Sequence, residues 1–186
     1  MDTTSASLLE RLRVSGDQEA WSKLVDLYSP LLLFWARKAG LARADAEDLV
    51  QEVFAVLVRK LPQFQYDRGR GFRNWLRTIT LNKWRDVCRR RARRAGLSDE
   101  PLGDVVEPPP EDLTDAEYRA QLVARALELI ESDFEPTTWR AFQQTAVLGR
   151  VPAEVAAELG VTRNVVYLAR CRVLRRLRDE LDGLIE

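Results

Sequence analysis

A proline-rich acidic stretch near the middle of the chain limits the folds that this sequence can adopt. From Leu97 to Glu117 it reads LSDEPLGDVVEPPPEDLTDAE, with eight acidic residues, no Lys or Arg and three consecutive prolines. Proline lacks the backbone N–H that a helix needs, and like charges keep such a segment extended. We therefore expect a flexible acidic linker at residues 95–117 that divides the 186-residue chain into two small domains, 1–94 and 118–186.

Both flanking parts have the periodicity of helices, so the predicted fold class is all-α. Asp17 can cap the first helix, Pro30 is expected to start the second, and Gly40 suits the left-handed position after the second helix ends. Trp139, Phe142 and Val147 are expected to supply core to the second domain. The predicted helices cover residues 17–28, 31–39, 43–61, 72–94, 115–130, a segment from Pro136, and two helices within 151–181 joined at Gly160.

The formal net charge of zero conceals two basic blocks. From Arg68 to Arg94 the sequence has ten arginines, one lysine and a single acid, Asp86, and a second excess of arginine follows within residues 137–178. Two basic blocks separated by an acidic tether indicate a polyanionic partner that is held at two places.

Several classes of protein are disfavoured by composition. The chain has no histidine, which removes His-based triads and His-ligated zinc, and Cys88 and Cys171 are too far apart in sequence to define a metal site. The longest apolar run, LLLFWA, is too short to span a bilayer, and the N-terminus is acidic where a signal peptide would be basic. We expect a cytoplasmic protein that is not an enzyme and needs no cofactor or metal.

The strongest local motif is a helix-turn-helix in residues 152–181. Gly160 supplies the turn, Thr162 can cap the second helix, Ala156 allows close helix crossing and Val166 is expected to anchor the second helix. In that arrangement the second helix would enter the major groove of DNA. The expected DNA-contacting side chains are Thr162, Arg163, Asn164, Tyr167, Leu168, Cys171, Arg172 and Arg175. The alternative is an ordinary helical hairpin with a solvated arginine face.

Two further helices carry charge with more than one interpretation. In the arginine-rich helix, Trp84 could stack on an unpaired base, or could pack beneath the linker. In DAEDLVQEVF, the acids Asp45, Asp48 and Glu52 lie on one side of a helix. They could bind a divalent metal, form a solvated face, or dock on a basic protein partner.

At these residues the chain resembles the extracytoplasmic-function (ECF) class of bacterial RNA polymerase sigma factors, within the sigma-70 family. DAEDLVQEVF resembles the core-binding segment of region 2, GFRNWLRTITLNKWRDVCRRR its promoter-melting and minus-ten segment, and AEVAAELGVTRNVVYLARCRVLRRL the minus-thirty-five reader of region 4. The resemblance implies a region 2 helical bundle, a region 4 helix-turn-helix, and three partners: core RNA polymerase, promoter DNA and, in many members of the family, an anti-sigma factor.

The resemblance also assigns roles to residues. Asp45, Asp48, Gln51 and Glu52 would dock on the clamp helices of the largest polymerase subunit. The minus-ten element would be held by Tyr66, Asp67, Arg68, Gly69, Arg70, Arg73, Arg77, Asn82, Lys83, Trp84 and Arg85. Two alternatives to this function remain open: a stand-alone helix-turn-helix regulator, and a metal-dependent DNA-processing protein that uses the three acids.

Overall fold

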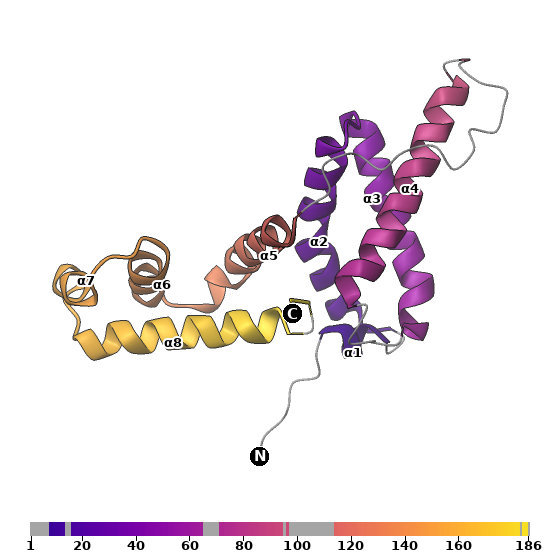
Figure 1. Ribbon diagram of the computed structural model, residues 1–186. Coiled ribbons are helices and arrows are strands. Elements are labelled where there is room, and N and C mark those ends of the chain that lie inside the picture. The colour runs from indigo at the N-terminus through magenta and orange to yellow at the C-terminus, as the bar shows by residue number, and fades with distance from the viewer. Residues whose placement is uncertain are drawn as a thin grey trace. The chain divides into compact units, whose positions relative to one another are not determined.

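The computed structural model describes residues 8–13, 16–64, 71–94, 96, 114–182 and 184–185. Every regular element in these ranges is helical (Figure 1), which confirms the all-α class. Contacts divide the chain into two compact units: the first includes the helices up to Leu122, and the second runs Val123–Asp182. Most of the predicted linker lies outside the described residues. None of the described helices is long and apolar enough to cross a membrane.

The first unit is built mainly from three long helices, with α3 packed against both α2 and α4 (Figure 1). Its core is aliphatic, with Tyr28 and Phe72 as the largest fully buried side chains. One side of α3 is buried, and it includes Leu49, Val53, Val56 and Leu57. The elements are α1 Leu8–Arg13, α2 Gln18–Lys38, α3 Arg43–Lys60, a 3-10 turn Leu61–Gln63, and α4 Phe72–Arg94.

The predicted helix break at Pro30 is wrong, because α2 continues through the proline. The predicted cap is confirmed: Asp17 Oδ1 accepts a hydrogen bond from the Ala20 amide at 3.0 Å. A helix-interior proline costs about 3 kcal/mol, whereas burying one large apolar side chain returns about 1.5–3 kcal/mol. Leu31 and Trp35 are both buried beyond the proline, so continuing the buried stripe outweighs the cost.

The second unit holds the helix-turn-helix. The boundary predicted at residue 118 falls inside α5, Asp115–Ile130, whose first two turns group with the first unit. After a 3-10 turn, Glu131–Asp133, the chain forms α6 Pro136–Phe142, a π-helical turn Gln143–Val147, α7 Pro152–Leu159 and α8 Arg163–Glu180. Two apolar clusters hold these helices together. One contains Ala141, Val155, Ala156, Val166 and Ala169, and the other contains Ile130, Trp139, Phe142 and Val173.

The π-helical turn overturns the predicted core role of Val147, which is 61% exposed. A π-helix has more residues per turn than an α-helix, so it moves the inward-facing positions along the chain. Thr145 is buried instead, and its hydroxyl donates to the Ala141 carbonyl at 2.7 Å. Trp139 and Phe142, which precede the change of pitch, are buried as predicted.

Candidate nucleic-acid interface

The turn between α7 and α8 has the geometry of a helix-turn-helix. Gly160 ends α7 in the left-handed conformation, with φ of +66°, which other residues seldom adopt. The Thr162 hydroxyl accepts a hydrogen bond from the Val165 amide at 3.4 Å and caps α8. Val166 is only 1% exposed and packs in the same cluster as Ala156. The predicted turn, cap and anchor are therefore all present.

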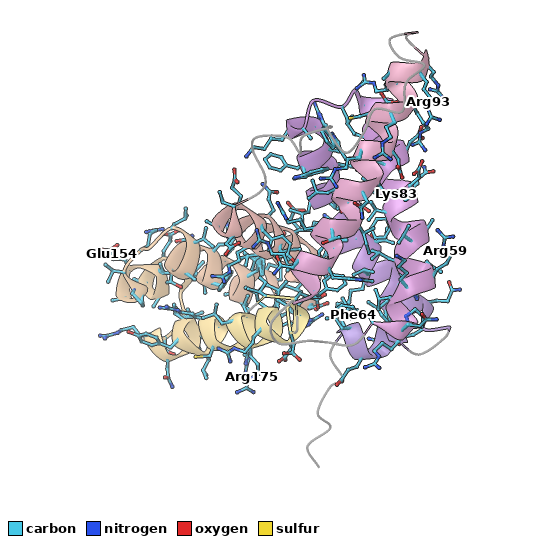
Figure 2. All side chains as sticks on the ribbon, turned by 45° about the vertical axis from the view of Figure 1, so that its right-hand side comes forward. Arg59, Phe64, Lys83, Arg93, Glu154 and Arg175 are labelled. Carbon is cyan, nitrogen blue, oxygen red and sulfur yellow. The ribbon has the colours of Figure 1, made fainter. Side chains whose placement is uncertain are left out.

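The opposite side of α8 is open to solvent. Tyr167 and Leu168 are about half exposed, at 48% and 49%, and Figure 2 shows Arg175 projecting outward from α8. Within the described ranges, no ion pair involves Arg163, Arg172 or Arg175. All eight residues predicted to contact the minus-thirty-five element are exposed: Thr162, Arg163, Asn164, Tyr167, Leu168, Cys171, Arg172 and Arg175. The helix thus presents apolar contact area, hydrogen-bond donors and positive charge on one face, which suits base edges and phosphates.

The basic residues of α4 are arranged differently, because some of them bind acids of α3. Lys83 Nζ lies 3.3 Å from Glu52 Oε2, and Arg90 lies 2.6 Å from Glu52 Oε1. Arg91 lies 3.1 Å from Asp45. Burial of Glu52 raises its pKa, but the hydrogen bonds from Arg90 and Lys83 outweigh that effect and leave the pKa below its usual value. These pairs connect residues 45–52 of α3 to residues 83–91 of α4.

The acidic face of α3 therefore has two parts. Asp45 and Glu52 are half-buried and paired with α4, whereas Asp48 and Gln51 are exposed. Neither of these two side chains makes a hydrogen bond or ion pair with another described residue. No group of three or more Cys, Asp or Glu residues in the described part of the chain could hold a metal ion. Asp45 and Glu52 bind cations of the protein itself, so the geometry does not support the metal-site alternative.

Trp84 does not present its ring for stacking on a base, because it is buried, with 7% exposure. In the structure the buried positions include Leu76, Thr80, Trp84 and Val87, at i, i+4, i+8 and i+11, so the buried stripe rotates around the helix and reaches the tryptophan. Its indole N–H has no hydrogen-bond partner among the described residues.

The remaining minus-ten residues have varied surroundings. Asn82 and Arg77 are exposed, and Arg85 is half-buried. Arg73 forms an ion pair with Asp115 at the start of α5. Five of the residues predicted to hold the minus-ten element lie outside the described residues: Tyr66, Asp67, Arg68, Gly69 and Arg70.

Sequence reasoning missed one buried contact near Arg73. The hydroxyls of Tyr28 and Tyr118 lie 2.9 Å apart, between residues that are 90 positions apart in the chain. Burial raises the pKa of Tyr118 to about 12, against the opposing effects of the Tyr28 hydrogen bond and the Arg73 charge. A capping motif, Thr114 followed by Glu117, marks the start of α5 in the sequence, but no local pattern indicates which helix Tyr118 contacts.

Comparisons with known proteins show which family the chain resembles. The family model described as Sigma-70 region 2 matches residues 24–94. The chain is 33% identical over 185 residues to RNA polymerase sigma factor CnrH of Cupriavidus metallidurans, covering 95% of this chain and 94% of that protein. It is 30% identical over 178 residues to ECF RNA polymerase sigma factor SigD of Mycobacterium tuberculosis, covering 90% and 80%.

A solved structure of CnrH in complex with the cytosolic domain of CnrY is 29% identical, covers 94% of this chain and 95% of that chain, and has a TM-score of 0.39. The sequence relatives favour a transcription initiation factor over a stand-alone regulator. The chain belongs to the ECF class of the sigma-70 family of RNA polymerase sigma factors, and its function is to initiate transcription.

Proposed function

We propose that the second unit reads the minus-thirty-five element through the exposed face of α8. The observation that carries this proposal is the two-sided construction of α8. Val166, Ala169 and Val173 are buried on one side, and the predicted DNA-contacting residues are all exposed. Side chains at the start of α8, such as Arg163 and Asn164, would meet base edges, and Arg175 would meet a phosphate.

The first unit, in this proposal, docks on the largest polymerase subunit and holds the minus-ten element. Asp48 and Gln51 make the direct polymerase contacts, because both are exposed. Asp45 and Glu52 have an indirect role: their ion pairs position α4. Asn82 and Arg77, exposed on α4, contact the non-template strand together with residues 66–70.

A measurement of binding to core RNA polymerase tests whether the exposed acid Asp48 contacts the polymerase directly. Asp48→Lys should lower the affinity for core polymerase by at least about tenfold, because it places a cation against the basic surface that an acidic docking face requires. Pull-down or biolayer interferometry with purified core polymerase measures this loss. Glu131→Lys is the matched control: it makes the same charge reversal at an exposed acid outside the proposed interface.

The result must be separated from misfolding, so the circular dichroism spectrum and Tm of each variant are compared with those of the parent. Loss of binding in Asp48→Lys with an unchanged Tm supports the proposed interface. Unchanged polymerase binding by a folded Asp48→Lys variant would contradict the proposal.

We further propose a cytoplasmic site of action, where core polymerase and promoter DNA are found, and control by an anti-sigma factor. The support for such control is that the relative CnrH is recorded in complex with the cytosolic domain of CnrY. Co-purification of a partner with the tagged chain, followed by inhibition of transcription by that partner, would test this control.

A further inference from the structure

The first two turns of α5, Asp115–Leu122, are fastened to α2. The hydroxyls of Tyr118 and Tyr28 form a buried hydrogen bond of 2.9 Å. At the end of α2, ten residues after Tyr28, Lys38 Nζ donates to Glu117 Oε1 at 3.0 Å. Tyr118 and Leu122 are buried, so one side of this part of α5 packs within the first unit.

The same two turns engage α4 through Arg73. Its guanidinium carbon lies 4.8 Å from the centre of the Tyr118 ring, in a cation–π contact, and the group also pairs with Asp115. The side chain of Asp115 is 72% exposed, whereas that of Arg73 is only 26% exposed. The Tyr118 ring of α5 thus covers one face of the Arg73 guanidinium group. The Asp115 carboxylate, at the start of α5, pairs with its charge.

Hydrogen bonds between Thr114 and Glu117 cap the N-terminus of α5. Glu117 Oε2 accepts a hydrogen bond from the Thr114 amide at 2.9 Å, and the Thr114 hydroxyl accepts one from the Glu117 amide at 3.2 Å. This reciprocal capping box begins the helix at the point where the chain meets the first unit. One carboxylate therefore caps α5 with one oxygen and binds Lys38 with the other.

A surface pocket borders Tyr118. It has a volume of about 40 Å³ and is lined mainly by apolar residues including Leu31, Trp35 and Leu76. The contacts that hold this part of α5 are specific, and some of them are partly exposed: the Asp115 side chain that pairs with Arg73 is 72% exposed.

We propose that the first two turns of α5 form an intramolecular latch that withholds Arg73 from single-stranded DNA in the free chain. A DNA phosphate and the Asp115 carboxylate are both anions that compete for the same guanidinium group. DNA binding would draw Arg73 away from Asp115 and Tyr118 and so release the latch. This inference rests on the proposed role of Arg73 in holding the minus-ten strand.

The test uses the full-length chain and a fluorescent mixed-sequence single-stranded DNA oligonucleotide, measured by anisotropy at low salt. Asp115→Asn removes the competing charge and keeps the size of the side chain. We expect its DNA affinity to rise by about two- to fivefold, the range expected for release of one partly exposed ion pair. In an Arg73→Ala background the same change should have no effect, because the competing group is gone.

A charge-matched control separates the latch from a general loss of negative charge. Glu131→Gln removes one charge from an exposed acid that belongs to the second unit. An equal gain in Glu131→Gln and Asp115→Asn would overturn the latch. If Arg73→Ala weakens binding but Asp115→Asn gives no gain, then Arg73 contacts DNA and the latch is wrong. If Arg73→Ala changes nothing, the proposed minus-ten role of Arg73 fails, and the latch fails with it.

Hydrogen exchange provides a second measurement that does not depend on affinity. The amides of residues 118–122 should be protected in the free chain and should lose protection when single-stranded DNA is saturating. Protection that persists at saturation would show that α5 stays docked while DNA is bound, and would overturn the proposal.

Discussion

The arginines of α4 and of α8 are similar in sequence but differ in their surroundings. On α4, Arg90 and Arg91 reach the carboxylates of Glu52 and Asp45 on the neighbouring helix. On α8, one arginine, Arg176, is similarly engaged, by Asp133 at 2.9 Å and by Glu180. The arginines of the predicted DNA face of α8 make no ion pair within the described ranges.

This difference shows that a count of positive charge does not measure how much of it is available to a ligand. A guanidinium group that is already paired must break that contact before it binds a phosphate, and the cost reduces the net gain in affinity. Part of the basic block of α4 therefore stabilises the first unit, whereas the exposed block of α8 is available for DNA. Substitutions that separate stability from DNA affinity test this distinction.

The largest expected effect is on the stability of the first unit. Glu52→Lys places a third cation beside Lys83 and Arg90, and we expect it to lower the free energy of unfolding by about 2 kcal/mol. Chemical denaturation of the full chain measures the loss. Asp48→Lys, the same kind of reversal on an exposed part of the same helix, should change stability by less than about 0.5 kcal/mol. Equal losses in the two variants would contradict the distinction between paired and exposed acids.

The next effect concerns the binding of α8 to DNA. Arg175→Ala should weaken binding of mixed-sequence duplex DNA several-fold and reduce the slope of log affinity against log salt by about 0.9, the value for one lost phosphate contact. Anisotropy titrations at several salt concentrations give this slope. Arg176→Ala is a control on the same helix, because Arg176 is held by Asp133 and Glu180. A slope change of equal size in Arg176→Ala would contradict the proposal that Arg175 contacts a phosphate and Arg176 does not.

The smallest expected effect is a pH dependence of the α3–α4 contact. The pKa of Glu52 is depressed below 4.5 in the folded chain, so its pairs stabilise the fold fully above that pH. The contribution is lost as the pH falls through the folded pKa. Urea denaturation should therefore show that Glu52→Gln is less stable than the parent by up to about 1 kcal/mol at neutral pH. The difference should shrink at acidic pH, and a gap that widens on acidification would contradict the assignment.

The parts of the structure that local sequence determines could be predicted. Gly160, Thr162 and Val166 act within a few residues of one another, through backbone conformation, one cap and one buried contact. Their spacing alone was therefore enough to identify the helix-turn-helix and its exposed face. The family resemblance added the partners, which the residue pattern alone describes only as a polyanion and a basic protein.

Features that depend on distant packing could not be predicted. Whether Pro30 interrupts a helix depends on how much apolar surface is buried beyond it, and the position of Val147 depends on a local change of helical pitch. The acids of α3 were identified as one face, but the pairing of Asp45 with Arg91 joins residues 46 positions apart. The Tyr28–Tyr118 contact likewise has no signal in the sequence near either residue.

The two cysteines offer a practical use of the difference in exposure between the units. Cys171 is exposed on α8, whereas Cys88 on α4 is half-buried, and burial raises the pKa of the Cys88 thiol despite the nearby Arg91 charge. Because the thiolate is the form that reacts with maleimides, Cys88 should react slowly. A fluorophore can therefore be attached preferentially to Cys171 of the unmodified sequence, and because Cys171 lies on the predicted DNA face of α8, the attached label should itself weaken binding to duplex DNA.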